Sequence, residues 1–208
     1  ESVRVKPFRY EKDIQNIVEK NLIQVFDLEF VCSEMTIKNF RIDTLCYDKS
    51  NKSFVIIEYK KGKSYSVIDQ GYSYLSLMLN NKSDFILEYN ENKSGNLKRG
   101  NIDWTQSKVL FISPNFSTYQ KESINFRDLP IELYEIKRFS NNSIIINQIK
   151  GEGSESVSKL SKGKGVIGKV SKEVKVYSEE DIVSFGEKEI QSLYYSLRSS
   201  ILELDDVE

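Results

Sequence analysis

The stretch that most constrains the fold is residues 40–61, FRIDTLCYDKSNKSFVIIEYKK, because it holds two strand-like runs with charged residues inside them. Residues 41–47 alternate between two faces, which predicts a β-strand. The expected faces are Ile42, Thr44 and Cys46 on one side, and Asp43, Leu45 and Tyr47 on the other. Residues 54–57 form a continuous apolar run, which is typical of a strand buried on both faces. The polar residues 48–53 favour a turn, so we expect the two strands to form a hairpin.

Three charged residues in this stretch point to chemistry. Side chains alternate along a strand, so Glu58 and Lys60 should share one face. If Asp43 shares that face, two carboxylates converge and repel each other unless a divalent cation lies between them. Magnesium suits such a pair, and Lys60 could then orient or deprotonate a water or stabilise charge on a phosphate. The alternative is that Glu58 and Lys60 are a solvated strand end and Asp43 a surface carboxylate.

The chain of 208 residues contains no histidine, and this absence excludes whole classes of mechanism. Ser-His-Asp catalysis, Cys-His catalysis and histidine-ligated zinc are excluded for this chain on its own. Acid–base work must fall to Asp, Glu, Lys or Tyr. Cys32 and Cys46 lie in apolar runs, which indicates reduced core residues of a cytoplasmic protein. No apolar run reaches membrane-spanning length and no signal-peptide pattern opens the chain, so we expect no membrane partner.

Amphipathic helices are predicted on both sides of the hairpin. Residues 10–26 place apolar side chains at three- and four-residue steps. Glu19 lies near the apolar side of this helix, so it is either a surface carboxylate or a residue that reaches the Asp43 site. Residues 66–79 repeat the pattern, and Gln70 and Tyr74, four positions apart, should lie on one face.

Further strand-like runs complete the first part of the chain. Residues 27–37 should form an antiparallel meander with the hairpin, and residues 108–114, 131–139 and 143–149 also have strand patterns. Helix, three strands, helix and strand in that order predict an α/β fold with at least one crossover connection. We therefore expect an αβββαβ core, with a mixed central sheet flanked by helices, in a domain of residues 1–150.

Lysines gather just after the second strand and again beyond residue 150. Lys61 and Lys63 belong either to a solvated loop or to a lip that faces phosphates. Residues 151–176 are rich in lysine, serine and glycine, which predicts a basic flexible linker with DNA contact as a secondary role. Residues 177–208 are predicted to be an amphipathic helix from an incomplete C-terminal module. Its apolar stripe must dock on the body, on a missing domain, or on a second chain in a homodimer.

With these elements in place, the chain resembles the PD-(D/E)XK nuclease superfamily over about residues 10–149. The subgroup it resembles most is the RecB-like and mismatch-endonuclease type, which combines an early helix glutamate with three further motifs. The matching motifs are Arg41-Ile42-Asp43, Glu58-Tyr59-Lys60, and Gln70 with Tyr74. The resemblance implies a restriction-endonuclease-like core.

The resemblance also implies a metal-dependent DNA endonuclease. Asp43 and Glu58 would bind Mg²⁺, with Mn²⁺ as a substitute, and Lys60 would assist the water nucleophile. Gln70 would support the site or contact DNA, and Glu19 would be the early helix glutamate. The expected nucleic-acid contacts are Lys61, Lys63 and Tyr74. The alternative is a catalytically inactive nucleic-acid-binding or dimerisation module with the same fold.

Overall fold

The structure is a computed structural model that describes residues 3–62, 66–160 and 164–204. The chain divides into two compact units, Glu1–Lys175 and Val176–Glu208. The first unit holds a β-sheet and the helices that cover it, and the second is helical. Each unit is described by itself.

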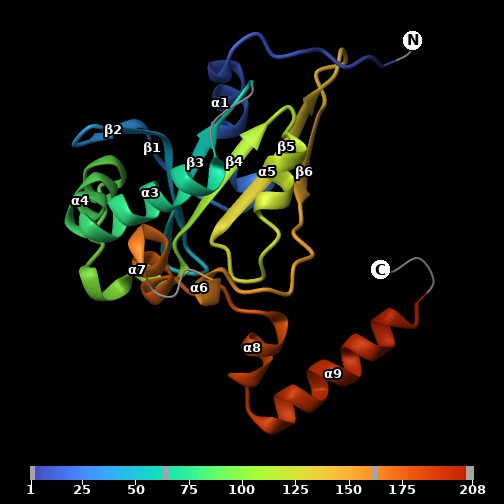
Figure 1. Cartoon of the computed structure of the whole chain (residues 1–208). Helices are drawn as coiled ribbons and strands as arrows, with labels where there is room; N and C mark the ends of the chain where they lie inside the picture. The colour runs from blue at the N-terminus through green and yellow to red at the C-terminus, as the bar shows by residue number, and fades with distance from the viewer. Residues whose placement is uncertain (1–2, 63–65, 161–163, 205–208) are drawn as a thin grey trace. The chain divides into compact units, whose positions relative to one another are not determined.

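A six-stranded mixed sheet forms the centre of the first unit (Figure 1). Its strands are β1 (Glu29–Ile37), β2 (Phe40–Asp48), β3 (Ser53–Tyr59), β4 (Lys108–Ser113), β5 (Ile131–Arg138) and β6 (Ile144–Ile149), side by side in that order. β1, β2 and β3 pair antiparallel, β4 pairs parallel with both β3 and β5, and β6 pairs antiparallel with β5. The parallel step from β3 to β4 needs a crossover, and helices supply it. The predicted α/β class, with its αβββαβ order and mixed sheet, is confirmed.

Helices cover both faces of this sheet. The helices of the first unit are α1 (Glu11–Glu19), α2 (Leu22–Phe26), α3 (Val67–Asn80), α4 (Lys82–Lys93), α5 (Thr118–Ser123), α6 (Val157–Leu160) and α7 (Gly165–Glu173), with short 3₁₀ helices at Arg99–Asn101 and Trp104–Gln106. Figure 1 shows α1 on one side of the sheet, and α3 and α4 on the other. Within the described part of the chain, none of the helices has the length and apolar character needed to cross a bilayer.

The two faces of the sheet bury two separate apolar cores. One core joins α1 and α2 to the sheet, with Ile14, Val18 and Leu22 packed against Val55, Ile57 and Leu110. The other joins α3 and α4 to the opposite face, with Leu75, Met78 and Phe85 packed against Phe54, Ile56 and Val109. The apolar run of β3 feeds both cores and is fully buried, which confirms its predicted burial on both faces.

The predicted alternation along β2 is wrong at one position. Ile42 packs in the α3-side core together with Leu45, whereas strict alternation would put these residues on opposite faces. The change falls at Glu34 and Asp43, which lie opposite each other and are left out of the pairing, although the register is the same on both sides of them. Glu34 has a positive φ of 57°, in the left-handed region that strand residues rarely adopt. The register shift between the two strands lies further along β1, between Phe30 and Cys32.

The first predicted helix is two helices rather than one. α1 ends at Glu19 and α2 begins at Leu22, because Asn21 leaves the helical conformation with φ −124° and ψ 16°. The Asn21 side chain donates a hydrogen bond of 2.7 Å to the Ile17 carbonyl, which caps the end of α1.

The segment predicted as a flexible linker, residues 151–176, differs most from expectation. It contains α6 and α7, and Val157, Val170 and Val174 are buried in the α3-side core. A Cβ on Gly153 would lie 1.9 Å from the Asn125 carbonyl oxygen, so this backbone packs directly on the body. The compact unit accordingly runs to residue 175 rather than 150. The lysine-rich composition suggested a linker. The prediction missed the packing because it depends on only a few buried valines.

The second unit contains α8 (Glu179–Ser184) and α9 (Lys188–Leu202). A single helix was predicted here, but Gly186 lies in the turn between the two, and Glu187 has an extended backbone with ψ 155°. Ser178 caps α8 by accepting a hydrogen bond from the Asp181 N–H. The apolar residues of the predicted stripe are exposed: Ile182, Phe185, Ile190, Leu193, Leu197, Ile201 and Leu204.

Candidate active site

Glu58, at the end of β3, is the centre of a polar cluster on the α3 side of the sheet. Its side chain is buried, and its Oε1 accepts hydrogen bonds from Lys60 Nζ at 2.7 Å and Gln70 Nε2 at 2.8 Å. Its Oε2 accepts a bond of 2.9 Å from the Tyr74 hydroxyl. A buried carboxylate needs such partners to remain charged. The structure therefore brings together four of the predicted site residues.

Close packing of α3 on the sheet places Gln70 and Tyr74 over Glu58. A Cβ on Gly71 would lie 2.5 Å from Ile131 Cδ1, so glycine at this position lets the helix approach the sheet. Tyr74 is 5% exposed, which does not fit its predicted role as a nucleic-acid contact. The Tyr74 hydroxyl instead donates a hydrogen bond to Glu58 and so supports that carboxylate.

Asp43 joins the cluster from β2. The pairing of β2 with β3 stops at Thr44 and Ile57, and Asp43 and Glu58 are the next residues on the two strands. Asp43 Oδ2 accepts a hydrogen bond of 3.0 Å from the Tyr59 N–H. The carboxylate thus takes a main-chain donor at the point where the two strands part.

The electrostatics of Asp43 are unfavourable to its charge. Burial and then the negative charge of Glu58 raise its pKa from 3.8 to about 6. The Tyr59 N–H, Lys60 and Arg41 act in the opposite direction and lower it, but they do not compensate. Asp43 and Glu58 each directly follow the last β2–β3 pair, Thr44 and Ile57, so Glu58 can act on Asp43 in this way.

Cationic side chains surround this pair unevenly. The Lys60 side chain is 18% exposed and bound to Glu58, whereas Arg41 is 65% exposed. Lys61 is exposed, but its ammonium donates to the Arg9 carbonyl, and its N–H donates to Glu11 at 2.9 Å. The predicted contact at Lys63 lies outside the described residues.

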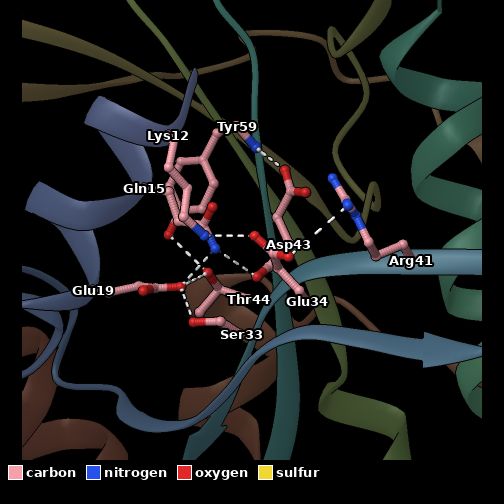
Figure 2. A network of polar contacts seen from close by, with 9 residues as sticks. All are labelled: Lys12, Gln15, Glu19, Ser33, Glu34, Arg41, Asp43, Thr44 and Tyr59. Atoms are coloured by element: carbon pink, nitrogen blue, oxygen red, sulfur yellow. Dashed lines mark hydrogen bonds and ion pairs between the residues drawn. The ribbon is translucent and has the colours of Figure 1, made fainter. Parts of the chain in front are cut away.

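Glu19 does not join Asp43 and Glu58. Figure 2 shows its carboxylate on the other side of β2, where Oε1 accepts hydrogen bonds from Gln15, Ser33 and Thr44 at 2.8, 2.7 and 2.6 Å. It is not among the charges that shift the pKa of Asp43. Among the described residues, no group of three or more His, Cys, Asp or Glu side chains is placed to hold a metal ion. In this structure the Glu19 carboxylate is held by Gln15, Ser33 and Thr44 rather than by contacts to Asp43 or Glu58.

Two carboxylates with a nearby ammonium still fit a magnesium ion. Mg²⁺ is commonly held by one or two protein carboxylates and completes its shell with waters and substrate phosphate oxygens. Asp43 and Glu58 would serve as such a pair; burial is the main cause of the raised pKa of Asp43, and a cation between the two would offset the further contribution from Glu58. The donor set is oxygen only, which suits Mg²⁺ or Mn²⁺ rather than a softer metal.

Sequence reasoning missed the residues behind the site. Gln15 is 4% exposed and donates to the Asp43 carbonyl at 2.9 Å. The Thr44 and Tyr59 hydroxyls lie 3.1 Å apart on the same side (Figure 2). A signal for Gln15 did exist, because it is an amide between Ile14 and Val18 on the apolar side of an amphipathic helix.

No known protein-family model matches the chain. A longer protein of Haemophilus influenzae, described as uncharacterized, is 46% identical over 208 residues. The alignment covers 99% of this chain and 69% of that protein.

Three solved structures share part of the fold at low sequence identity. EndoMS in complex with dsDNA has a TM-score of 0.39 and 13% identity, over 64% of this chain and 47% of that one. A repair endonuclease from Pyrococcus abyssi has a TM-score of 0.32 and 16% identity, over 57% of this chain and 44% of that one. Pyrococcus furiosus SfsA in complex with Ca²⁺ has a TM-score of 0.33 and 15% identity, over 67% and 62%. The chain spans less than two thirds of each of these solved chains.

Proposed function

We propose that this chain, which belongs to the same family as the uncharacterized Haemophilus influenzae protein, is a metal-dependent endonuclease that hydrolyses DNA. We assign it to the PD-(D/E)XK superfamily, in the RecB-like and mismatch-endonuclease subgroup, on the motifs at residues 41–43, 58–60 and 70–74. The chain spans 69% of that relative, and the proposal is made for this chain.

One observation carries the proposal. Asp43 and Glu58 come together where β2 and β3 part, and Lys60 is bound to Glu58 on the same side of the sheet. Solvated strand ends would not bury a carboxylate to 5% exposure and give it three side-chain donors. The arrangement therefore favours a site for a cation and a phosphate over the surface alternative.

Each residue has a distinct role in this proposal. Asp43 and Glu58 would hold Mg²⁺, or Mn²⁺ in its place. When bound, the ion would lower the pKa of a water and stabilise charge on phosphate oxygens. Lys60, at 2.7 Å from Glu58, is placed to hydrogen-bond the attacking water or to neutralise charge that develops on the phosphate. Gln70 and Tyr74 hold Glu58 in one orientation through its two oxygens.

DNA is the proposed substrate because phosphate charge suits the cations near the pair. The overall net charge is −1, so attraction must be local. Arg41 is exposed two residues before Asp43, and Lys12 is 51% exposed on α1. Both contact Glu34, with Lys12 Nζ at 2.5 Å and Arg41 at 3.9 Å (Figure 2). These cations, with Lys61, would flank a phosphodiester held at Asp43 and Glu58.

The test is cleavage of a set of plasmid, linear, branched, mismatched and single-stranded DNA and RNA, with Mg²⁺, Mn²⁺ or EDTA. Asp43→Ala is run beside the parent, with Asp84→Asn as a control because Asp84 is an exposed carboxylate on α4. We expect cleavage that needs the metal, is lost in Asp43→Ala and is kept in Asp84→Asn.

The competing function is a nucleic-acid-binding module that has no catalysis. It predicts no cleavage of any substrate, together with salt-dependent binding that survives EDTA and Asp43→Ala. Cleavage by Asp43→Ala at the parental rate would instead reject the assignment of the metal site.

A second candidate function, association of two chains, is favoured by the exposed apolar stripe on α8 and α9. Phe185 is 69% exposed and Leu193 is 65% exposed, and such a stripe is costly in water. We propose that this stripe supports a homodimer. Sedimentation of the chain with and without residues 178–208 tests it, and a chain that sediments as a monomer in both forms contradicts it.

A further inference from the structure

We propose that α1 sets the position of the Asp43 carboxylate through Gln15, with Glu19 as the anchor, so that these two are positioning residues of the metal site. The inference rests on the proposed function, because it concerns the same carboxylate pair. It gives Glu19 a role different from the one implied by resemblance, since Glu19 would act through other residues rather than bind the ion.

The first step of the argument is that Asp43 lies at an interruption in the sheet. In the described register, β1 pairs with β2 at Ser33–Thr44 and Met35–Ile42, which leaves out Glu34 and Asp43. On the other edge, β2 pairs with β3 only as far as Thr44. Main-chain pairing therefore does not fix Asp43 on either side, and something else must hold it.

Gln15 supplies one of the missing contacts. Its Nε2 donates to the Asp43 carbonyl at 2.9 Å and to Glu19 Oε1 at 2.8 Å. Both partners are acceptors, so the amide nitrogen, rather than the amide oxygen, must face them. Gln15 is 4% exposed, which leaves little room for water to replace either bond.

The contacts of Gln15 close into a ring around Asp43 (Figure 2). Glu19 Oε1 accepts from Thr44 at 2.6 Å, and the Thr44 hydroxyl lies 3.1 Å from the Tyr59 hydroxyl. The Tyr59 N–H then donates to Asp43 Oδ2 at 3.0 Å, while Gln15 returns to the Asp43 carbonyl. The ring thus holds both the main chain and the carboxylate of Asp43.

A closed set of hydrogen bonds that is at least partly shielded from water acts as a unit, and a carboxylate that binds a metal depends on such support. Loss of a supporting partner of this kind typically weakens metal affinity by about 10- to 100-fold. A merely structural role predicts lower stability but unchanged affinity of the folded protein. Metal affinity and stability therefore have to be measured separately.

The experiment is a titration of the full chain with Mn²⁺, followed by electron paramagnetic resonance at a temperature where every variant is folded. Gln15→Met removes the donor without adding charge, and Gln24→Met makes the same change at an exposed position on α2. We expect Gln15→Met to weaken Mn²⁺ binding about 10- to 100-fold. Gln24→Met should bind as the parent does.

Thr44→Val keeps the shape of a fully buried side chain and breaks the link between Glu19 and Tyr59, so it serves if Gln15→Met does not fold. Mn²⁺ affinity equal to that of the parent in every folded variant of this pair overturns the inference.

Asp43→Asn separates the two proposals. If the parent does not bind Mn²⁺, or Asp43→Asn binds it equally well, the proposed function fails. If Asp43→Asn loses binding and Gln15→Met and Thr44→Val keep it, only the positioning role fails.

Discussion

The two sides of the sheet at the ends of β2 and β3 differ in how their charges are compensated. On the α3 side, Asp43 and Glu58 share one close ammonium, from Lys60, and burial and Glu58 raise the pKa of Asp43. On the α1 side, the Glu19 carboxylate accepts three hydrogen bonds from neutral donors. Neighbouring residues on the same strands thus have different roles on the two sides of the sheet. We propose that the α3 side takes a cation, whereas the hydrogen bonds on the α1 side hold the strands in place.

The largest expected effect is from Lys60→Met. Removal of the ammonium should lower the rate of DNA cleavage about 100- to 10,000-fold, because one general acid–base or charge-stabilising group is lost. Mn²⁺ binding should persist, since the variant keeps both carboxylates. Single-turnover cleavage and Mn²⁺ titration measure the two effects.

Lys108→Met is the matched control for that change. Lys108 Nζ also binds a glutamate on the same sheet, Glu132 Oε1 at 2.9 Å. Its loss should leave the cleavage rate within about twofold of the parent, well below the effect expected for a group in the reaction. If both substitutions lowered the cleavage rate equally, Lys60 would have no role that a lysine elsewhere on the sheet lacks.

The next effect is on stability as a function of pH in EDTA. A carboxyl whose pKa is raised from 3.8 to about 6 in the folded state binds its proton more tightly there than in the unfolded chain. Asp43 should therefore destabilise the fold as pH rises from about 4 to about 7, by on the order of 1–3 kcal/mol. Asp43→Asn should remove this loss, while its amide oxygen can still accept the Tyr59 N–H.

Urea unfolding of the parent and of Asp43→Asn at pH 4.5 and pH 7.5 measures that difference. The variant should gain stability relative to the parent at the higher pH. An equal difference at both pH values would mean that Asp43 is not under electrostatic strain and would remove one reason to expect a cation.

The smallest effect is expected from Tyr74→Phe. The substitution deletes the donor to Glu58 Oε2 and should cost about 1 kcal/mol of stability and about tenfold in cleavage rate. Tyr89→Phe is the control, because Tyr89 donates in the same way to Glu29 Oε2 at 3.0 Å, away from Glu58. The control should lose similar stability and no cleavage, and a loss of cleavage in both would assign Tyr74 to the fold alone.

The α3 side was largely predictable from the sequence, and the α1 side was not. Glu58 and Lys60 follow an apolar run that is typical of a buried strand, and Gln70 and Tyr74 have helical spacing. These are local patterns. The support from Gln15 depends on the gap in strand pairing at Glu34 and on the acceptors that lie next to the Gln15 amide in the folded chain. Neither can be predicted from the spacing of residues in the sequence. The same limit applies to Val170, which a lysine-rich composition concealed.

The most direct test of the central claim is the rate of DNA cleavage at saturating Mg²⁺ by the parent and by Asp43→Asn, with folding of both confirmed by thermal unfolding. The account predicts that the variant is at least as stable as the parent near neutral pH and cleaves about 1,000-fold more slowly or not at all. A folded variant that cleaves at the parental rate would contradict the claim that the α3 side of the sheet carries the chemistry.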